Sequence, residues 1–234
     1  MSLYLIINII TIAIPLLLSF DKRVHYYTYW KALIPSILIT MAFFIVWDVI
    51  FTEHGIWGFN ERYIGQTTFL GLPLEEFLFF ITVPYASVFI IYVLEHYFPK
   101  LRMGKSLTHY FSIILIGFLL LIAIMNLEKA YTAVNFFAAA IVIGLVLVGK
   151  PSLLRRFYVS YLVILIPFGL VNGVLTGSFI DEQVVWYNNQ ENLGIRLATI
   201  PVEDVFYGMT LILLSYFLTE TLRNRALHRK QEAA

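Results

Sequence analysis

Seven stretches of the chain are almost continuously apolar, and the polar residues are concentrated between them. The apolar stretches cover residues 3–20, 32–51, 72–94, 110–125, 131–148, 157–175 and 197–218. Each is close to the ~20 residues that an α-helix needs to cross the hydrocarbon core of a bilayer, and the fourth is the shortest. The pattern predicts an all-α integral membrane protein with seven transmembrane helices.

The basic residues between these stretches indicate the orientation in the membrane. With seven crossings, 13 of the 16 lysines and arginines fall on the side that carries the C-terminus, and Arg62, Lys129 and Arg196 fall on the other. Short cytoplasmic loops are enriched in lysine and arginine. We therefore expect a multi-pass protein of the cell membrane with its N-terminus outside and its C-terminus in the cytoplasm.

The same acidic motif occurs twice, which indicates a tandem duplication. Pro73-Leu74-Glu75-Glu76 and Pro201-Val202-Glu203-Asp204 lie 128 residues apart, and Asp48 and Asn172 upstream of them lie 124 apart. Two such units joined by one extra crossing should be parallel, related by an axis along the membrane normal. The predicted organisation is a three-helix unit (1–98), a linker with the fourth helix (99–130), a second three-helix unit (131–222) and a cytoplasmic tail (223–234), which we expect to be frayed.

The paired acids are candidates for proton-transfer chemistry. Ionisable groups within membrane helices are costly and usually functional. Two neighbouring carboxylates about 6 Å apart repel by about 3 kcal/mol at an effective dielectric near 20, and the helix dipole returns only ~0.3–1 kcal/mol. Each pair should therefore hold one proton near neutral pH. An acid beside a carboxylate can both deliver and remove protons.

Aromatic residues are concentrated near both acid pairs, and some are expected in the interfacial belt of any membrane protein. Their ring faces also stabilise positive charge, by ~2 kcal/mol or more each in a dry site. Asp48 and Asn172 are equivalent positions on the same side of the membrane as the acids. Because one is an acid and the other an amide, the two halves are chemically unequal. The candidate substrate-binding residues are Trp57, Phe59, Asn60, Phe79, Phe80, Asn172, Tyr187, Asn188 and Tyr207.

Several classes of function conflict with the residues present. The chain has no cysteine, no pair of histidines at metal-ligand spacing and no glycine-rich phosphate loop, so we expect neither a metal nor a nucleotide cofactor. The net charge of +1 gives no sign of nucleic-acid binding. A retinal protein would need a lysine in the seventh helix, and residues 197–218 contain none. A prenyl-diphosphate transferase would need aspartate-rich motifs, which are absent from the sequence. A scaffold, or a transporter built from 3+1+3 parallel helices, remains open.

The chain resembles the integral-membrane lycopene cyclases of bacteria, archaea and fungi, in their tandem two-unit form. The resemblance covers most of the chain. It rests in the first unit on Asp48, the segment Gly55 to Asn60 and Pro73-Leu74-Glu75-Glu76, and in the second unit on Asn172, Thr176-Gly177, Tyr187-Asn188, Gly194-Ile195-Arg196 and Ile200-Pro201-Val202-Glu203-Asp204. Either acidic motif alone is weak evidence, but two in register are specific.

The resemblance implies lycopene and carotenoid intermediates as substrates, with the bilayer and other carotenoid enzymes as partners. It implies a redox-neutral ring closure in which an acid protonates the terminal double bond, an internal double bond attacks the cation, and a carboxylate removes a ring proton to give a β-ionone end. We rank Glu75 and Glu203 first as acid and base, with Glu76 and Asp204 as their partners and Asp48 next. Their individual roles, the oligomeric state and the number of cyclised ends stay open.

Overall fold

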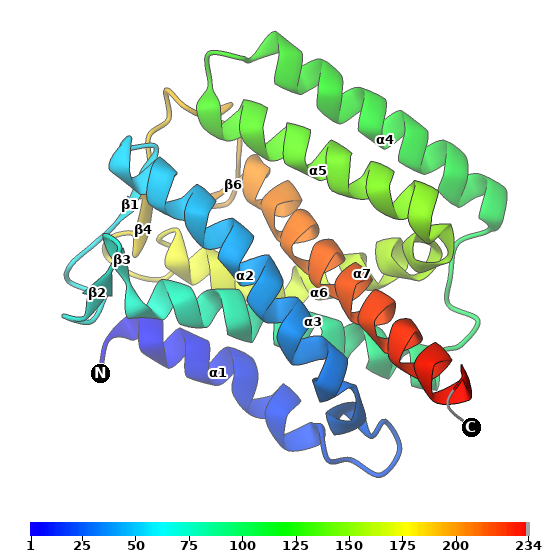
Figure 1. Ribbon diagram of the computed structural model, residues 1–234. Helices are drawn as coiled ribbons and strands as arrows, with labels where there is room; N and C mark the ends of the chain where they lie inside the picture. Colours follow the sequence, from blue (N-terminus) through cyan, green and yellow to red (C-terminus); the bar gives the residue numbers. More distant parts are fainter. Residues whose placement is uncertain (233–234) are drawn as a thin grey trace.

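The computed structural model describes residues 1–232, which form a bundle of seven α-helices with short strands gathered at one end (Figure 1). Within these residues, six helices are long and apolar enough to cross a membrane, and α1 is apolar but has only 16 residues. The prediction of an all-α membrane protein is confirmed. The helices are α1 (Leu3–Leu18), α2 (Trp30–Glu53), α3 (Leu74–Tyr97), α4 (Lys105–Met125), α5 (Ala130–Gly149), α6 (Pro151–Leu175) and α7 (Val202–Glu232).

Several helix boundaries differ from the sequence prediction. Helix α7 begins at Val202 and not near residue 197, because the chain before it is extended. It then continues to Glu232, so the described part of the segment expected to be a frayed tail is helical, and residues 233–234 lie outside the described residues. Helix α4 has 21 residues and is therefore longer than its apolar stretch.

Short strands that the sequence analysis did not predict precede α3 and α7. Strand β2 (Thr68–Phe69) pairs with β3 (Leu72–Pro73), and β5 (Arg196–Leu197) pairs with β6 (Ile200–Pro201). The tight turns place Leu70, Gly71 and Ala198 at positive φ, a conformation that glycine adopts most easily. The prolines thus end a strand immediately before each helix, and the acids occupy the first turn of that helix.

Equivalent positions of the two repeats meet at both ends of the bundle. Strand β1 (Trp57–Phe59) pairs with β4 (Val185–Tyr187), and Gly58 lies opposite Trp186, its equivalent in the second repeat. At the other end, the Tyr92 hydroxyl donates to Glu220 Oε1 at 2.5 Å, and these residues are also 128 apart. A pseudo-two-fold axis through both pairs runs along the helices, which is the parallel arrangement that the sequence predicts.

The repeats interlock and do not pack as separate halves. Helix α1 packs on α3, and α5 packs in the same way on α7. Helix α2, however, packs mainly on α7 of the other repeat, and α6 packs on α3 more than on α7. Helix α4, the linker, lies outside α5 (Figure 1). Side chains from both repeats therefore meet in the centre of the bundle.

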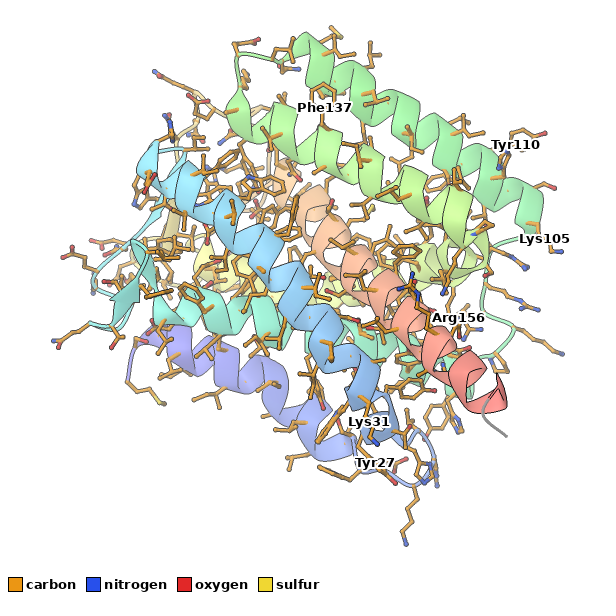
Figure 2. The ribbon with its side chains drawn as sticks, in the orientation of Figure 1. Tyr27, Lys31, Lys105, Tyr110, Phe137 and Arg156 are labelled. Atoms are coloured by element: carbon orange, nitrogen blue, oxygen red, sulfur yellow. The ribbon has the colours of Figure 1, made fainter. Side chains whose placement is uncertain are left out.

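The basic residues gather at the end of the bundle opposite the strands. Figure 2 shows Lys31, Lys105 and Arg156 at that end, on three different helices. The acidic motifs open α3 and α7 at the strand end (Figure 1). The two ends therefore differ in charge in the sense that the sequence analysis expected.

Candidate active site

A small cavity lies between the two repeats near the strand end. Its volume is about 50 Å³, roughly the space of one or two water molecules. Three carboxyl groups from three helices line it: Asp48 of α2, Glu76 of α3 and Asp204 of α7, all buried. The other lining residues are Tyr4, Trp57, Phe59, Phe79, Tyr131, Phe168, Asn172, Leu175, Val185, Tyr187, Tyr207, Gly208 and Leu211.

The two carboxyl groups of the first repeat each accept one hydrogen bond from an aromatic side chain. Tyr4 donates from its hydroxyl to Glu76 Oε2 at 2.5 Å. Trp57 donates from Nε1 to Asp48 Oδ1 at 2.6 Å. The other oxygen of Asp48 is buried and has no hydrogen-bond partner among the described residues. A buried carboxyl oxygen without a donor is unfavourable as part of a carboxylate, so this side of the cavity suits a protonated acid.

Asp204, the third carboxyl group, accepts three hydrogen bonds. Tyr131 donates to Oδ1, and Oδ2 accepts from Asn172 Nδ2 at 2.6 Å and from the Tyr187 hydroxyl at 3.0 Å. Loss of solvation, followed by the nearby Asp204 charge, raises the pKa of Tyr187, so this phenol stays a donor near neutral pH. Three donors stabilise a carboxylate, so the two sides of the cavity favour opposite protonation states.

The first acids of the two motifs do not line the cavity. Glu75 Oε1 accepts from the Gly65 backbone N–H at 2.8 Å and from the Ser2 hydroxyl. Glu203 Oε1 accepts from the Leu193 N–H at 2.7 Å and from the Thr132 hydroxyl at 2.7 Å. In each repeat the glutamate thus connects its helix to the preceding loop and to the start of a neighbouring helix. Both second oxygens, Glu75 Oε2 and Glu203 Oε2, are buried and lack a partner among the described residues.

Aromatic rings enclose the carboxyl groups. The Trp57 ring centroid lies 5.1 Å from that of Tyr131 and 5.9 Å from that of Tyr207, and Tyr131 stacks on Tyr187 at 5.7 Å. Phe79 lines the cavity as well. A cavity with acid, carboxylate and ring faces can deliver a proton, stabilise a transient cation and take a proton back.

Three of the predicted substrate-binding residues lie outside the cavity lining. Phe80 is buried against Phe44, with ring centroids 5.9 Å apart. Asn60 donates from Nδ2 to Glu182 at 2.8 Å in the loops. Asn188 accepts at Oδ1 from the Gln190 N–H. The two asparagines thus stabilise the loops at the strand end.

The sequence analysis missed several cavity residues, of which Tyr4 and Tyr131 are the most important. They are equivalent residues of the two repeats, and each donates a hydrogen bond to the second acid of a motif. One helical turn further, Asn8 and Asn135 donate to the backbone carbonyls of Glu75 and Glu203. An alignment of the first helix of each repeat, at an offset of 127 residues, would have found both pairs.

Within the described residues no group of three or more histidine, aspartate or glutamate side chains could hold a metal ion.

Comparison with known proteins identifies the family to which the chain belongs. The sequence model of the family described as lycopene cyclase matches residues 1–94 and 128–222, which correspond to the two repeats. Searches of curated proteins and of solved structures return no match. The transporter alternative gains no support from the match. The chain therefore belongs to the lycopene cyclase family, membrane enzymes of carotenoid biosynthesis that cyclise lycopene.

Proposed function

We propose that the protein is a lycopene β-cyclase, which converts an acyclic end of lycopene to a β-ionone ring by proton transfers alone. One observation carries the proposal: carboxyl groups from both repeats, with unequal hydrogen bonding, line a single cavity that aromatic rings enclose. One proton enters the terminal double bond and one leaves the new ring, so substrate and product are isomers. The reaction as balanced needs no oxidant or reductant.

Asp48 and Glu76 together form the acid. Two charged carboxylates lining one water-poor cavity repel strongly, which favours a pair that shares one proton. Each has a single donor, and Asp48 Oδ2 has none among the described residues. The shared proton is delivered to the terminal double bond of the substrate, and the developing positive charge is then carried by carbon.

Asp204 is the base. Its three donors favour the carboxylate before the proton arrives, and each hydrogen bond to a charged group contributes ~1.5–3 kcal/mol. In the second repeat Asn172 replaces Asp48, so a neutral donor stands where the first repeat has a second acid. That replacement accounts for the division into acid and base sides. Asp204 removes the ring proton and completes the double bond of the β-ionone ring.

The rings of Trp57, Tyr131 and Tyr207 stabilise the cation between the two proton transfers. They lie within 6.5 Å of one another, and each ring face in a desolvated site offers ~2 kcal/mol to a positive centre. Glu75 and Glu203, ranked first in the sequence analysis, act as positioning residues. Their oxygens hold the loops and the neighbouring helices that fix the orientation of Glu76 and Asp204.

Expression in cells that accumulate lycopene tests this function. The protein should convert the pigment to γ-carotene or β-carotene, separated by chromatography, and a Glu76→Gln, Asp204→Asn double variant at equal abundance should leave lycopene unchanged. An unchanged pigment profile with well-folded wild-type protein would reject the proposed function.

A further inference from the structure

An apolar groove opens on the lipid-facing side of the bundle between α1, α3 and α6. It has a volume of about 460 Å³, within the range of ligand sites. Its lining is apolar apart from Thr11 and Ser87, and the Thr11 hydroxyl already donates to the Ile7 carbonyl at 2.8 Å. The lining residues are Ile10, Thr11, Ile14, Pro15, Val83, Ala86, Ser87, Phe89, Ile90, Ile164, Pro167, Phe168, Leu170 and Val171.

The groove is separated from the carboxyl-lined cavity by one side chain. Phe168 lines both spaces. Its ring lies against Gly208, where an added Cβ would come within 2.9 Å of the ring. The cavity itself holds only about 50 Å³, too little for the end of an isoprenoid chain. A substrate end can therefore reach the carboxyl groups from the groove when the Phe168 ring turns aside.

The groove is long enough to hold part of a long hydrocarbon chain. On α3 it extends from Val83 to Ile90, a rise of about 10 Å along the helix. It leads from the level of the cavity toward the basic end of the bundle, within the apolar part of three helices. Ile10, Ile14 and Leu170 on its rim are about two-thirds exposed, and in a membrane they face lipid. A polyene could enter sideways from the bilayer without leaving an apolar environment.

Two positions in the equivalent region beside α5, α7 and α2 carry larger side chains. Ala86 corresponds to Leu214, and Val171 corresponds to Trp47. Trp47 is buried, and its ring lies 5.5 Å from Phe44 and 5.1 Å from Tyr207. At these two positions the region beside α1, α3 and α6 therefore leaves more room for a ligand than the region beside α5, α7 and α2.

We propose that this groove binds the polyene chain of the substrate while one end passes Phe168 to reach Asp48, Glu76 and Asp204. The proposal rests on the proposed function and adds to it the route and the binding site of the chain. Because the equivalent region carries Leu214 and Trp47 where the groove has Ala86 and Val171, a single end is cyclised at a time. A molecule with two rings is produced only after the substrate leaves, reverses and binds again.

Protection of single cysteines from labelling tests the proposal, and the cysteine-free chain gives a clean background. Ile14→Cys places a thiol in the groove, and Ile166→Cys places one on the lipid-facing side of α6 outside it. The native side chains are 66% and 68% exposed, so the pair is matched. Lycopene that occupies about 90% of the protein should slow N-ethylmaleimide labelling of Ile14→Cys by about tenfold, since the rate follows the unoccupied fraction. The Ile166→Cys rate should not change.

A second measurement uses the side chains of the second repeat as plugs. Ala86→Leu and Val171→Trp should raise KM at least about tenfold, because an apolar pocket discriminates by that factor for a single methylene. Ile166→Trp is the control and should keep the wild-type KM. Equal protection of both cysteines, protection by phospholipid alone, or a normal KM in folded Ala86→Leu would overturn the proposal. Protection by lycopene without any cyclisation by the wild type would instead reject the proposed function and leave the groove assignment standing.

Discussion

Exchange of each glutamate of the first motif for glutamine separates the catalytic role from the structural one. In Glu76→Gln the amide still accepts from Tyr4, whose hydroxyl lies 2.5 Å from Oε2, but it has no transferable proton. General acid catalysis contributes ~10²–10⁴-fold, which corresponds to ~2.7–5.5 kcal/mol in the barrier. Because the hydrogen bond from Tyr4 is weakened but kept, stability should fall by only about 1 kcal/mol.

Glu75→Gln should behave in the opposite way. Its amide oxygen can still accept from the Gly65 N–H, 2.8 Å from Oε1, and from the Ser2 hydroxyl. Weakening two charge-assisted bonds to neutral ones should cost ~1–3 kcal/mol of stability. The rate per folded molecule should stay within a few-fold of the wild type, because Glu75 does not line the cavity.

The assay compares initial rates of lycopene consumption in detergent with thermal unfolding of the same preparations. We expect a large rate loss with a small stability loss for Glu76→Gln, and the reverse for Glu75→Gln. The matched pair Asp204→Asn and Glu203→Gln should repeat the pattern in the second repeat. A dead Glu75→Gln beside an active Glu76→Gln, at equal folded amounts, would refute the reasoning and restore the ranking predicted from sequence.

Two further predictions follow from side-chain contacts, and a third follows from the distribution of basic residues. Asn172→Asp adds a carboxyl group beside Asp204, where Asn172 Nδ2 now lies 2.6 Å from Oδ2. The new pair should hold a proton where the base is needed and slow cyclisation at least about tenfold. A rate equal to that of the wild type would contradict this. Tyr92→Phe removes the 2.5 Å hydrogen bond from the Tyr92 hydroxyl to Glu220. It should lower the unfolding free energy by ~1.5–3 kcal/mol and leave KM unchanged. An unaltered Tm would contradict this prediction. Reporter fusions after Met103 and after the C-terminus should read cytoplasmic and one after Glu61 outside; a cytoplasmic signal at Glu61 would overturn the topology.

The helices and the duplication could be predicted because each leaves a direct mark on the sequence. Long apolar stretches specify helices in a bilayer, and the register of the two acidic motifs specifies the repeat. Loop chemistry was harder to interpret. In the second repeat the turn between β5 and β6 places Ala198 at positive φ with no glycine at that position to indicate it, so the hairpin and the later start of α7 were missed.

The orientation of the acids could not be predicted from sequence. Neighbouring helical residues point about 100° apart, so one acid of each pair must face away from the cavity, but the motif does not say which. That choice depends on tertiary contacts: Gly65 and Leu193 in the preceding loops hold Glu75 and Glu203. Tyr4 and Tyr131 then contact the remaining acids from the starts of α1 and α5.

The central claim, ring closure by proton transfer between the two sides of one cavity, is tested most directly by isotope incorporation. Purified protein is mixed with lycopene in deuterated water, without flavin or nicotinamide, and the products are analysed by mass spectrometry. The account predicts products that are isomers of lycopene apart from one deuterium per new ring, and no product from the Glu76→Gln, Asp204→Asn double variant. Rings that form without deuterium, or only when a redox cofactor is added, would contradict it.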